Sequence, residues 1–349
     1  MYIQIDGHKV GEDKPVFIIA ELSANHLQDY KLAVKSIQAI KKTGADAVKL
    51  QTFTPDTITL NCNNRYFRIR KGTLWSGKTL YQLYQKAYTP WDWQPKLKEI
   101  AENLGLVCFS TPFDKSAVDF LEKIKVGAYK IASFEITDLP LIEYAASKGK
   151  PMIISTGIAV TEEIREAVQA CRKKGNNNIA LLKCTSAYPT PLLEVNLMVI
   201  PYLKRKFKTV VGLSDHTLEI SVPIAAVALG ASIIEKHFIL NRKLGGPDSA
   251  FSLEPEEFMT MVKSIRGVEK ALGSSTLKLS KTAESSRTFS RSLFVVNNIS
   301  RGEVFTERNV KSIRPGYGLP PKYLKNVLGR ISKQNIKRGT PLSSKYFQR

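Results

Sequence analysis

The sequence predicts a (β/α)8 barrel followed by a small β-rich domain, and three observations support this fold class. Short runs rich in Ile, Val and Leu recur eight times before residue 240. Segments with the apolar periodicity of helices separate these runs. The composition becomes polar after Gly273, and a stretch with many turns follows. Eight strand and helix units in about 270 residues match the size of such a barrel, which leaves the C-terminal part for a second domain.

The eight predicted strands show little strict alternation of apolar and polar residues, which is typical of parallel strands buried on both faces. They are residues 16–20, 47–51, 106–110, 128–132, 152–155, 179–185, 210–214 and 232–236. Helical periodicity is clear at 32–42, 93–104, 162–173 and 220–229. Glycine follows several of the helical segments, at a position where a helix end favours a left-handed residue.

The remaining segments complete the predicted organisation. Residues 2–10 read as a small hairpin that caps the floor of the barrel. The long insertion at 54–90 is rich in aromatic and turn residues, and loops of this length often close over active sites. We therefore predict a catalytic barrel at 1–273, a linker at 274–292 and a β-rich domain at 293–349.

Composition excludes several classes of protein. A chain of 349 residues with 43% hydrophobic residues can bury a large core. No apolar run has the length of a membrane span, and the polar N-terminus lacks the apolar core of a signal peptide. The cysteines form no Cys-x-x-Cys pair, which favours reduced thiols in a cytoplasmic protein. They are Cys62, Cys108, Cys171 and Cys184.

The net charge of +21 is unevenly distributed. Residues 276–349 contain 16 Lys and Arg against three Asp and Glu. A basic polyanion-binding protein is therefore an alternative from a different functional class. No nucleic-acid-binding motif is present and the basic residues are scattered, so we expect neither nucleic acid nor membrane as a partner. A basic surface also attracts small anionic substrates.

Two histidines end the last two predicted strands. His216 closes the motif GLSDHT beside Asp215, and His237 lies in IIEKHF beside Glu235. Two imidazoles at neighbouring strand ends suit a divalent metal that holds an oxygen atom of a substrate. The alternative is a pair of hydrogen-bonded structural histidines. The strand context favours the metal, with Mn2+ expected and Mg2+ or Co2+ as the other candidates.

Three lysines lie inside separate apolar strands, namely Lys49, Lys130 and Lys183. A buried cation without a partner costs several kcal/mol, so these lysines need anions. Serine and threonine residues lie at the same strand ends, where the reactive groups of such barrels gather. Lysines, hydroxyls and backbone N–H groups together predict a phosphate pocket, with structural ion pairing of the lysines as the alternative.

The motifs also resemble those of the sialic-acid (nonulosonate) synthase family from end to end. They are IAELSANH, DAVKLQTFTPDT, FSTPFD, YKIASFEI, ISTGIA, KCTSAYPTP, GLSDHT, IEKHF, GGPDSAFSLEPEEF, RSLFV and SIRPGYGLPP. The resemblance implies a metal-dependent barrel followed by an antifreeze-like (SAF) domain. It also implies a domain-swapped homodimer, in which the small domain covers the partner's active site.

Within the family, the chain is most similar to the branch that makes pseudaminic acid. GTLWSGKTLYQLYQKAYTPWDW, KIASFEI and DSAFSLEP carry this similarity, and Phe134 replaces a glycine of the sialic branch. Leu27 and Ser186 replace common asparagines. The implied reaction joins phosphoenolpyruvate, 2,4-diacetamido-2,4,6-trideoxy-L-altropyranose and water to give pseudaminic acid and phosphate, as used in surface glycans such as those of flagellin. Sialic or legionaminic acid synthesis, and a phosphoenolpyruvate-dependent ketose-phosphate synthase, are the enzymatic alternatives.

The resemblance also implies roles for individual residues. His216 and His237 would hold the metal, and Glu135 would handle the proton of the attacking water. Arg314 would reach an acetamido oxygen of the sugar. The residues expected to hold phosphoenolpyruvate are Lys49, Thr111, Lys130, Ser133, Ser155, Ser186 and Ser214. The residues expected to bind the sugar or order the metal shell are Glu21, Gln51, Tyr188 and Asp248.

Overall fold

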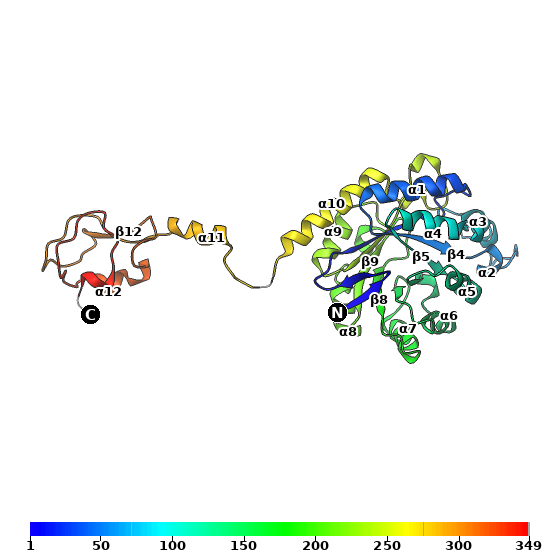
Figure 1. Ribbon diagram of the computed structural model, residues 1–349, viewed down its shortest axis with the longest axis horizontal. Coiled ribbons are helices and arrows are strands. Elements are labelled where there is room, and N and C mark those ends of the chain that lie inside the picture. Colours follow the sequence, from blue (N-terminus) through cyan, green and yellow to red (C-terminus); the bar gives the residue numbers. More distant parts are fainter. Residues whose placement is uncertain (71, 275, 348–349) are drawn as a thin grey trace. The chain divides into compact units, whose positions relative to one another are not determined.

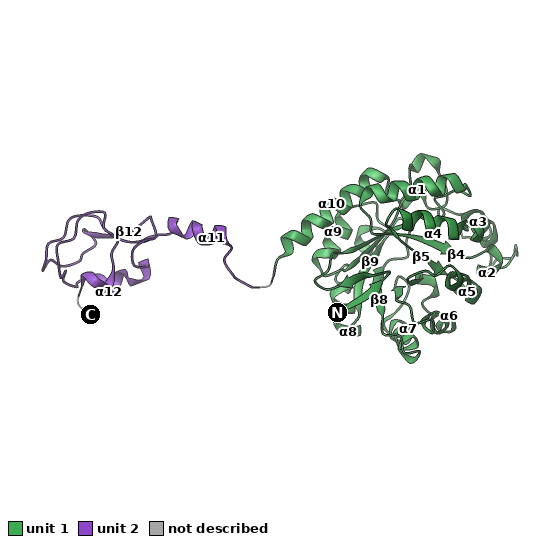
Figure 2. Cartoon of the chain, viewed as in Figure 1, with its two compact units in different colours: residues 1–273 green, residues 274–349 purple. Residues whose placement is uncertain are grey.

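The computed structural model describes residues 1–70, 72–274 and 276–347. It contains two compact units, Met1–Gly273 and Ser274–Arg349, which Figure 2 colours separately. The boundary coincides with the change in composition after Gly273. Residue 275 of the predicted linker and residues 348–349 of the predicted second domain lie outside the described residues.

The first unit is a closed barrel of eight parallel strands, as the sequence predicts (Figure 1). Each strand lies within two residues of its predicted position. The strands are β3 (Phe17–Glu21), β4 (Ala47–Thr52), β5 (Val107–Pro112), β6 (Tyr129–Ile131), β7 (Met152–Ser155), β8 (Ile179–Cys184), β9 (Val210–Asp215) and β10 (Ile233–His237). Strand β10 pairs with both β9 and β3, and this pairing closes the ring.

Helices surround the barrel, and most of them bury apolar residues in its core (Figure 1). They are α1 (Tyr30–Thr43), α2 (Pro55–Ile58), α3 (Leu80–Ala87), α4 (Gln94–Asn103), α5 (Lys115–Lys123), α6 (Leu139–Ala146), α7 (Thr161–Lys173), α8 (Val199–Phe207), α9 (Ser221–Ala228) and α10 (Pro255–Leu272). Helix α1 shows how the sequence sets the ends. The Asp29 side chain accepts hydrogen bonds from Lys31 N and Leu32 N, and Gly44 ends the helix at a φ of 82°.

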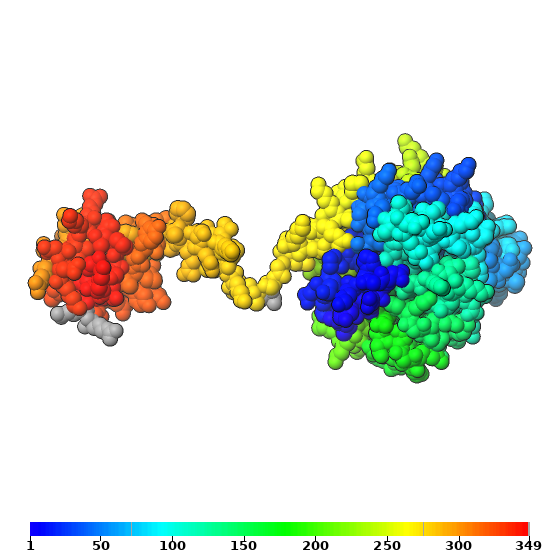
Figure 3. Space-filling view, viewed as in Figure 1, coloured from blue at the N-terminus to red at the C-terminus, as the bar shows by residue number. Residues whose placement is uncertain are grey.

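The N-terminal hairpin belongs to the barrel unit. Strands β1 (Tyr2–Ile5) and β2 (His8–Gly11) are antiparallel, and Ile3, Ile5 and Val10 join the barrel core. A Cβ atom at Gly127, just before β6, would lie about 2 Å from the carboxyl group of Asp6 in this hairpin. The hairpin therefore covers the N-terminal end of the strands, and Figure 3 shows it in dark blue on the surface of this unit.

The second unit has a small core of its own around Leu293, Phe305, Val310 and Leu342. Its regular elements are β11 (Ser292–Val295), β12 (Val310–Ile313), α11 (Lys281–Ser286) and α12 (Leu324–Val327). The two strands are antiparallel, and α11 lies within the predicted linker. Among the described residues of the chain, no helix combines the length and apolar character that crossing a membrane requires.

Candidate active site

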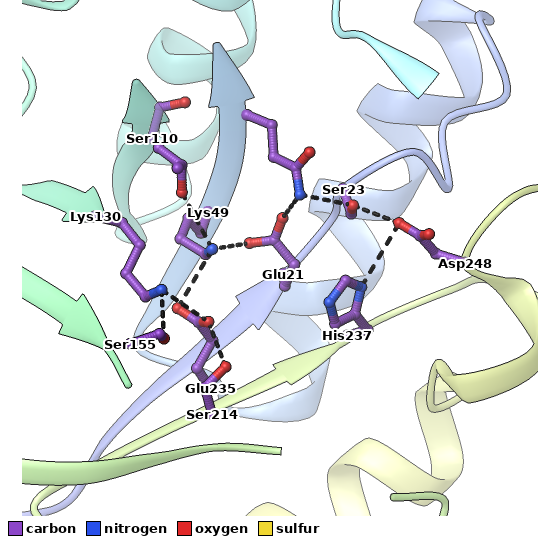
Figure 4. Close-up of polar contacts among 12 residues, drawn as sticks. Glu21, Ser23, Lys49, Ser110, Lys130, Ser155, Ser214, Glu235, His237 and Asp248 are labelled. Atoms are coloured by element: carbon purple, nitrogen blue, oxygen red, sulfur yellow. Dashed lines mark hydrogen bonds and ion pairs between the residues drawn. The ribbon is translucent and has the colours of Figure 1, made fainter. Parts of the chain in front are cut away.

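The polar side chains predicted at the strand ends converge inside the barrel (Figure 4). Directly paired residues of parallel strands point to the same side of a sheet. Glu21 pairs with Lys49, and Ser214 pairs with Glu235. The Ser214 hydroxyl donates to Glu235 Oε1 at 2.8 Å. The barrel axis is therefore lined by charged groups from β3, β4, β6 and β10.

Two lysines and two carboxylates form one buried cluster. Lys49 Nζ lies 2.7 Å from Glu21 Oε2 and 3.4 Å from Glu235 Oε2, and Lys130 Nζ lies 3.6 Å from Glu235 Oε1. All four side chains are 5% exposed or less. Lys49 Nζ also donates to Thr111 Oγ1. The two charges of each sign offset the cost of removing the lysines from water.

The two carboxylates of this cluster differ in their acidity. Burial raises the pKa of Glu21 above its ordinary value, although Lys49 partly opposes the effect. Burial acts on Glu235 too, but Lys130 and Lys49 outweigh it and hold the pKa of Glu235 low. A phosphate group entering between the lysines can therefore be matched by protonation of Glu21, which frees Lys49 for the new anion.

A set of hydroxyl groups lies around Lys130. Its Nζ donates to Ser155 Oγ at 2.7 Å, and Gly157 N donates to Ser133 Oγ. The Ser186 hydroxyl is buried and has no hydrogen-bond partner in the described structure. A Cβ atom at Gly157 would lie 2.3 Å from Ser186 Oγ and 2.7 Å from Ser133 Oγ. Only glycine fits beside these hydroxyls, which suit a phosphate ester.

The two predicted metal ligands lie side by side, with ring centroids 5.4 Å apart. His216 Nδ1 lies 3.0 Å from the carbonyl oxygen of Thr185. A carbonyl only accepts, so Nδ1 carries a proton, and in the neutral ring Nε2 keeps its lone pair, as is common for metal-bound histidine. His237 Nδ1 is buried without a hydrogen-bond partner in the described structure, and it lies 3.9 Å from Asp248 Oδ2.

These two imidazoles fit a divalent metal with open positions. The lone pair on His216 and the unpartnered nitrogen on His237 are the donors that such an ion needs. Among the described residues, no group of three or more His, Cys, Asp or Glu side chains is arranged to hold a metal. An ion held here would take its other ligands from water or from the substrate.

A chain of hydrogen bonds runs from the charged cluster to Asp248, whose Oδ2 lies 3.9 Å from His237 Nδ1 (Figure 4). Gln51 Nε2 donates to Glu21 Oε1 at 3.0 Å and to Ser23 Oγ at 2.9 Å. Ser23 Oγ in turn donates to Asp248 Oδ2 at 2.5 Å. Asp248 is the carboxylate beside His237. The phosphate-type pocket and the histidine pair therefore form one continuous site.

A cavity of about 300 Å³ adjoins His237 and Asp248. Its walls are largely aromatic, and its volume suits a small organic ligand. The aromatic residues that line it are Phe53, Trp75, Tyr84, Phe113, Phe134, Tyr188 and Phe251. Gln51 and Glu135 add polar groups to the same walls. The ring of Tyr188 packs on His216, with centroids 4.4 Å apart.

Glu135 is the carboxylate in this cavity without a fixed partner. It ends the 3-10 helix η2 (Ser133–Glu135), and its Oε2 is buried without a hydrogen bond in the described structure. Burial raises the pKa of Glu135 to about 7, against the opposing effect of Lys130. A carboxylate poised near neutral pH is suited to exchange protons with a reacting group.

The insertion at 54–90 reaches the cavity, in line with the expectation for a long loop. Trp75 Nε1 donates to the carbonyl oxygen of Pro247 at 2.8 Å, and its ring lies 5.9 Å from that of Tyr188. This bond ties the insertion to the segment that carries Asp248 and Phe251. Trp75 lies in the motif GTLWSGKTLYQLYQKAYTPWDW, which carries the similarity to the pseudaminic acid branch, but the sequence does not single it out.

Some predicted residues lie elsewhere. Lys183 does not join the charged cluster, because its Nζ donates to Cys184 O and Thr185 Oγ1 instead. Strand alternation explains this, since Cys184 pairs with the inward-facing Ser214. Phe134 is 59% exposed at the edge of the cavity, whereas Phe251 is buried. Arg314 belongs to the second unit and is exposed there.

Other functional groups were missed. Glu235 was noted only as a neighbour of His237, although alternation along β10 places both side chains on the inner face of the barrel. Gly157 lay within the motif ISTGIA without a role. Cys184 was read as a buried thiol, and its sulfur lies 3.9 Å from His216 Nδ1.

Comparison with known proteins agrees with this geometry. The model of the NeuB family matches residues 36–277, and the SAF domain model matches residues 290–345. A pseudaminic acid synthase from Helicobacter pylori is 49% identical over 337 residues, which span 96% of this chain and 99% of the relative. A pseudaminic acid synthase from Campylobacter jejuni is 47% identical over 336 residues, spanning 96% and 98% of the two chains.

A solved structure shares the architecture. The N-acetylneuraminic acid synthetase of Leptospira borgpetersenii, in complex with citrate, has a TM-score of 0.74 and 33% sequence identity. The match covers 82% of this chain and 95% of the other. The family model covers most of the barrel and the relatives match almost the whole chain. The chain therefore belongs to the NeuB family, and its C-terminal unit contains a SAF domain.

Proposed function

We propose that the chain condenses phosphoenolpyruvate with 2,4-diacetamido-2,4,6-trideoxy-L-altropyranose and water to give pseudaminic acid and phosphate. The observation that carries this proposal is the continuity of the site. Hydrogen bonds through Gln51 and Ser23 link the cationic pocket to Asp248, which lies beside His237. These four residues line the aromatic cavity. The near-full-length relatives named pseudaminic acid synthase support the choice of sugar.

Phosphoenolpyruvate would bind in the cationic pocket. Lys49 and Lys130 match its negative charges, and the serine hydroxyls around Gly157 accept or donate the remaining hydrogen bonds. Ser214 and Thr111 complete the pocket. Ser214 donates a hydrogen bond to Glu235, and Thr111 accepts one from Lys49. Glu21 and Glu235 keep both lysines charged before the substrate arrives.

The sugar would enter the aromatic cavity in its open-chain form. Gln51, Tyr188 and Asp248 face this cavity and are suited to its hydroxyl and amide groups. Glu21 acts through Gln51 and Lys49, because it is almost fully buried. Phe251 and Trp75 offer apolar contact for the methyl group of a 6-deoxy sugar.

In the reaction, C3 of phosphoenolpyruvate forms a bond to the aldehyde carbon, and the aldehyde oxygen takes up a proton to become a hydroxyl group. Over the whole reaction, one proton of the added water accounts for this hydroxyl group and the other leaves with phosphate. Water adds at C2, and phosphate leaves with its bridging oxygen by C–O cleavage. Glu135 accepts the proton of this water. A divalent ion at His216 and His237, with Mn2+ as our choice and Mg2+ or Co2+ as alternatives, supplies Lewis-acid polarisation of the aldehyde oxygen when bound.

We also propose a domain-swapped homodimer, in which Arg314 of one chain serves the barrel of the other. The support is chemical, since the planar guanidinium of Arg314 is exposed in the SAF domain and can donate to a carbonyl oxygen such as that of an acetamido group.

The first prediction concerns the metal. His216→Ala or His237→Ala should abolish turnover while the barrel stays folded, because each variant removes one of two protein ligands. EDTA should abolish turnover by the wild-type chain, and added Mn2+ should restore this turnover. Phosphate release and the circular dichroism spectrum are the measurements. Full activity in a thoroughly chelated sample would show that no metal takes part.

The second prediction concerns pH. A base must be deprotonated to act, and burial keeps Glu135 protonated up to a pKa of about 7. The value of kcat/KM should therefore rise as pH increases through about 7 and level off above it. Glu135→Gln should lower turnover by about 10²–10⁴-fold and remove this rise.

The matched control for this test is Glu143→Gln on α6, which pairs with Lys174 at the protein surface. It should keep the wild-type profile. A wild-type rate that does not change between about pH 6 and pH 8 would contradict the role of Glu135 as the base.

The third prediction concerns the sugar. Turnover should be faster with the diacetamido-trideoxy-altrose than with N-acetylmannosamine, because an apolar wall favours a methyl group over a hydroxyl. Such a wall discriminates by only about 1–3 kcal/mol, so some activity with the second sugar is expected. Competition between the two sugars, followed by mass spectrometry, gives the ratio. A preference for N-acetylmannosamine would move the chain to the sialic branch.

The fourth prediction concerns assembly. A mixture of His216→Ala and Arg314→Ala chains should regain part of the activity that each has lost. In a swapped dimer of the two variants, one active site receives both intact residues. A chain cut near residue 280 should keep a folded barrel but lose nearly all activity. If the mixture stays inactive although subunits exchange, or if a monomer is fully active, the swap is wrong.

A further inference from the structure

We propose that Asp215 and Lys236 form a positioning pair that holds His216 and His237 in register from the outer side of the barrel. This inference builds on the proposed function, because it concerns the same histidines. Each residue of the pair directly precedes one histidine in the sequence. Because side chains alternate along a strand, the histidines face inward and the two preceding residues face outward.

The strand register brings the pair together. Asp215 and Lys236 are direct Cα partners between β9 and β10. Lys236 Nζ lies 2.5 Å from Asp215 Oδ2, and the two side chains are 0% and 3% exposed. Their neighbours Ser214 and Glu235 form a hydrogen bond on the opposite, inner face. Side-chain contacts therefore join β9 and β10 on both the outer and the inner face, at the residues that come just before the histidines.

Lys236 also fixes the turn after β9. Its ammonium group donates to the carbonyl oxygens of Thr217 at 2.5 Å and Glu219 at 3.2 Å. With Asp215 Oδ2 and with Thr217 Oγ1 at 3.3 Å, the group has four acceptors for its three N–H donors. Asp215 in turn accepts from Thr217 N and Thr217 Oγ1, both at 3.0 Å. His216 therefore lies between Asp215 and Thr217, whose positions these hydrogen bonds fix.

His237 depends on this arrangement more than His216 does. The ring of His216 has its own hydrogen bond to Thr185 O. His237 Nδ1 has no such bond within the described structure, so ring packing and the backbone set its position. Phe251 packs on the ring at 4.9 Å between centroids, and Lys236 fixes the adjacent backbone. Two imidazoles share an ion only if their nitrogens are placed to within a few tenths of an ångström.

Stability alone does not explain a fully buried lysine here. Replacing a buried ion pair with apolar residues of similar volume is often neutral or stabilising. What apolar side chains cannot supply is the set of directed hydrogen bonds to Asp215, Thr217 and Glu219. The pair therefore fixes the positions of nearby groups. Removing it should alter the positions of the histidine rings more than the stability of the fold.

The experiment replaces the pair in the full-length chain with Asp215→Leu and Lys236→Met together. Two measurements without substrate follow: Mn2+ affinity by electron paramagnetic resonance, and histidine ring signals by nitrogen-15 correlation spectra of the metal-free protein. The chain has only four histidines, so His8 and His26 serve as internal references. Lys150→Met, which removes a surface ion pair to Glu122, is the matched control.

We expect Mn2+ to bind about 10–100-fold more weakly to the double variant, in the range found when groups that orient metal ligands are removed. The ring signals of His216 and His237 should shift or broaden, while those of His8 and His26 should stay in place. Lys150→Met should change neither measurement. If the double variant does not fold, Asp215→Asn is the second variant, because it keeps the shape of the side chain while removing its charge.

Unchanged signals of His216 and His237 in a folded variant would overturn the proposal. The same holds if Mn2+ affinity falls only in proportion to an unfolded fraction. If the wild-type chain binds no Mn2+ but the two ring signals move in the variant, the positioning role stands and the metal part of the proposed function fails. The two inferences can therefore fail separately.

Discussion

Two lysines and two carboxylates share the axis of the barrel, and the rest of the site depends on their balance. Neither Lys49 nor Lys130 could be buried to this degree without Glu21 and Glu235. The carboxylates lie on β3 and β10, the strands whose pairing closes the ring. Glu21 and Lys49 pair across neighbouring strands, whereas the contacts of both lysines with Glu235 on β10 need the closed ring.

The balance also leaves room for a substrate. A neutral cluster with one carboxylate of raised pKa can accept an anion by taking up a proton, with no need to move a strand. The hydroxyls around Gly157 are suited to bind the charged part of a substrate. The aromatic cavity is suited to bind a part of matching shape. The hydrogen bonds from Gln51 through Ser23 to Asp248 hold these two regions at a fixed separation.

Much of the fold and of the candidate site could be predicted from the sequence, because the C-terminal ends of the strands meet at one end of a parallel barrel. The eight apolar runs located the strands to within two residues, and His216 and His237 followed from their positions at two of those ends. Lys183 was placed wrongly because an apolar run does not reveal which face a residue occupies. Side chains alternate along a strand, so Ser214 faces inward like His216, and Cys184, which pairs with Ser214, faces inward too. Lys183, one residue before Cys184, therefore faces outward. Trp75 and Gly157 act through contacts with distant segments, which no local pattern in the sequence records.

The aromatic cavity is the part of the proposed site that would select the sugar. An apolar wall distinguishes a methyl group from a hydroxyl by only about 1–3 kcal/mol, which is much less than the cost of disturbing the charged cluster. In the proposed reaction, the condensation chemistry would involve Lys49, Lys130, Glu135 and the histidines. The choice of sugar would fall to residues such as Phe251 and Trp75, which make no hydrogen bond to the charged cluster. Trp75 instead donates to Pro247, next to Asp248, so the insertion shapes the cavity through the segment that also orders the histidine pair. The insertion and the segment after β10 are therefore coupled in shaping the cavity, because one hydrogen bond joins them.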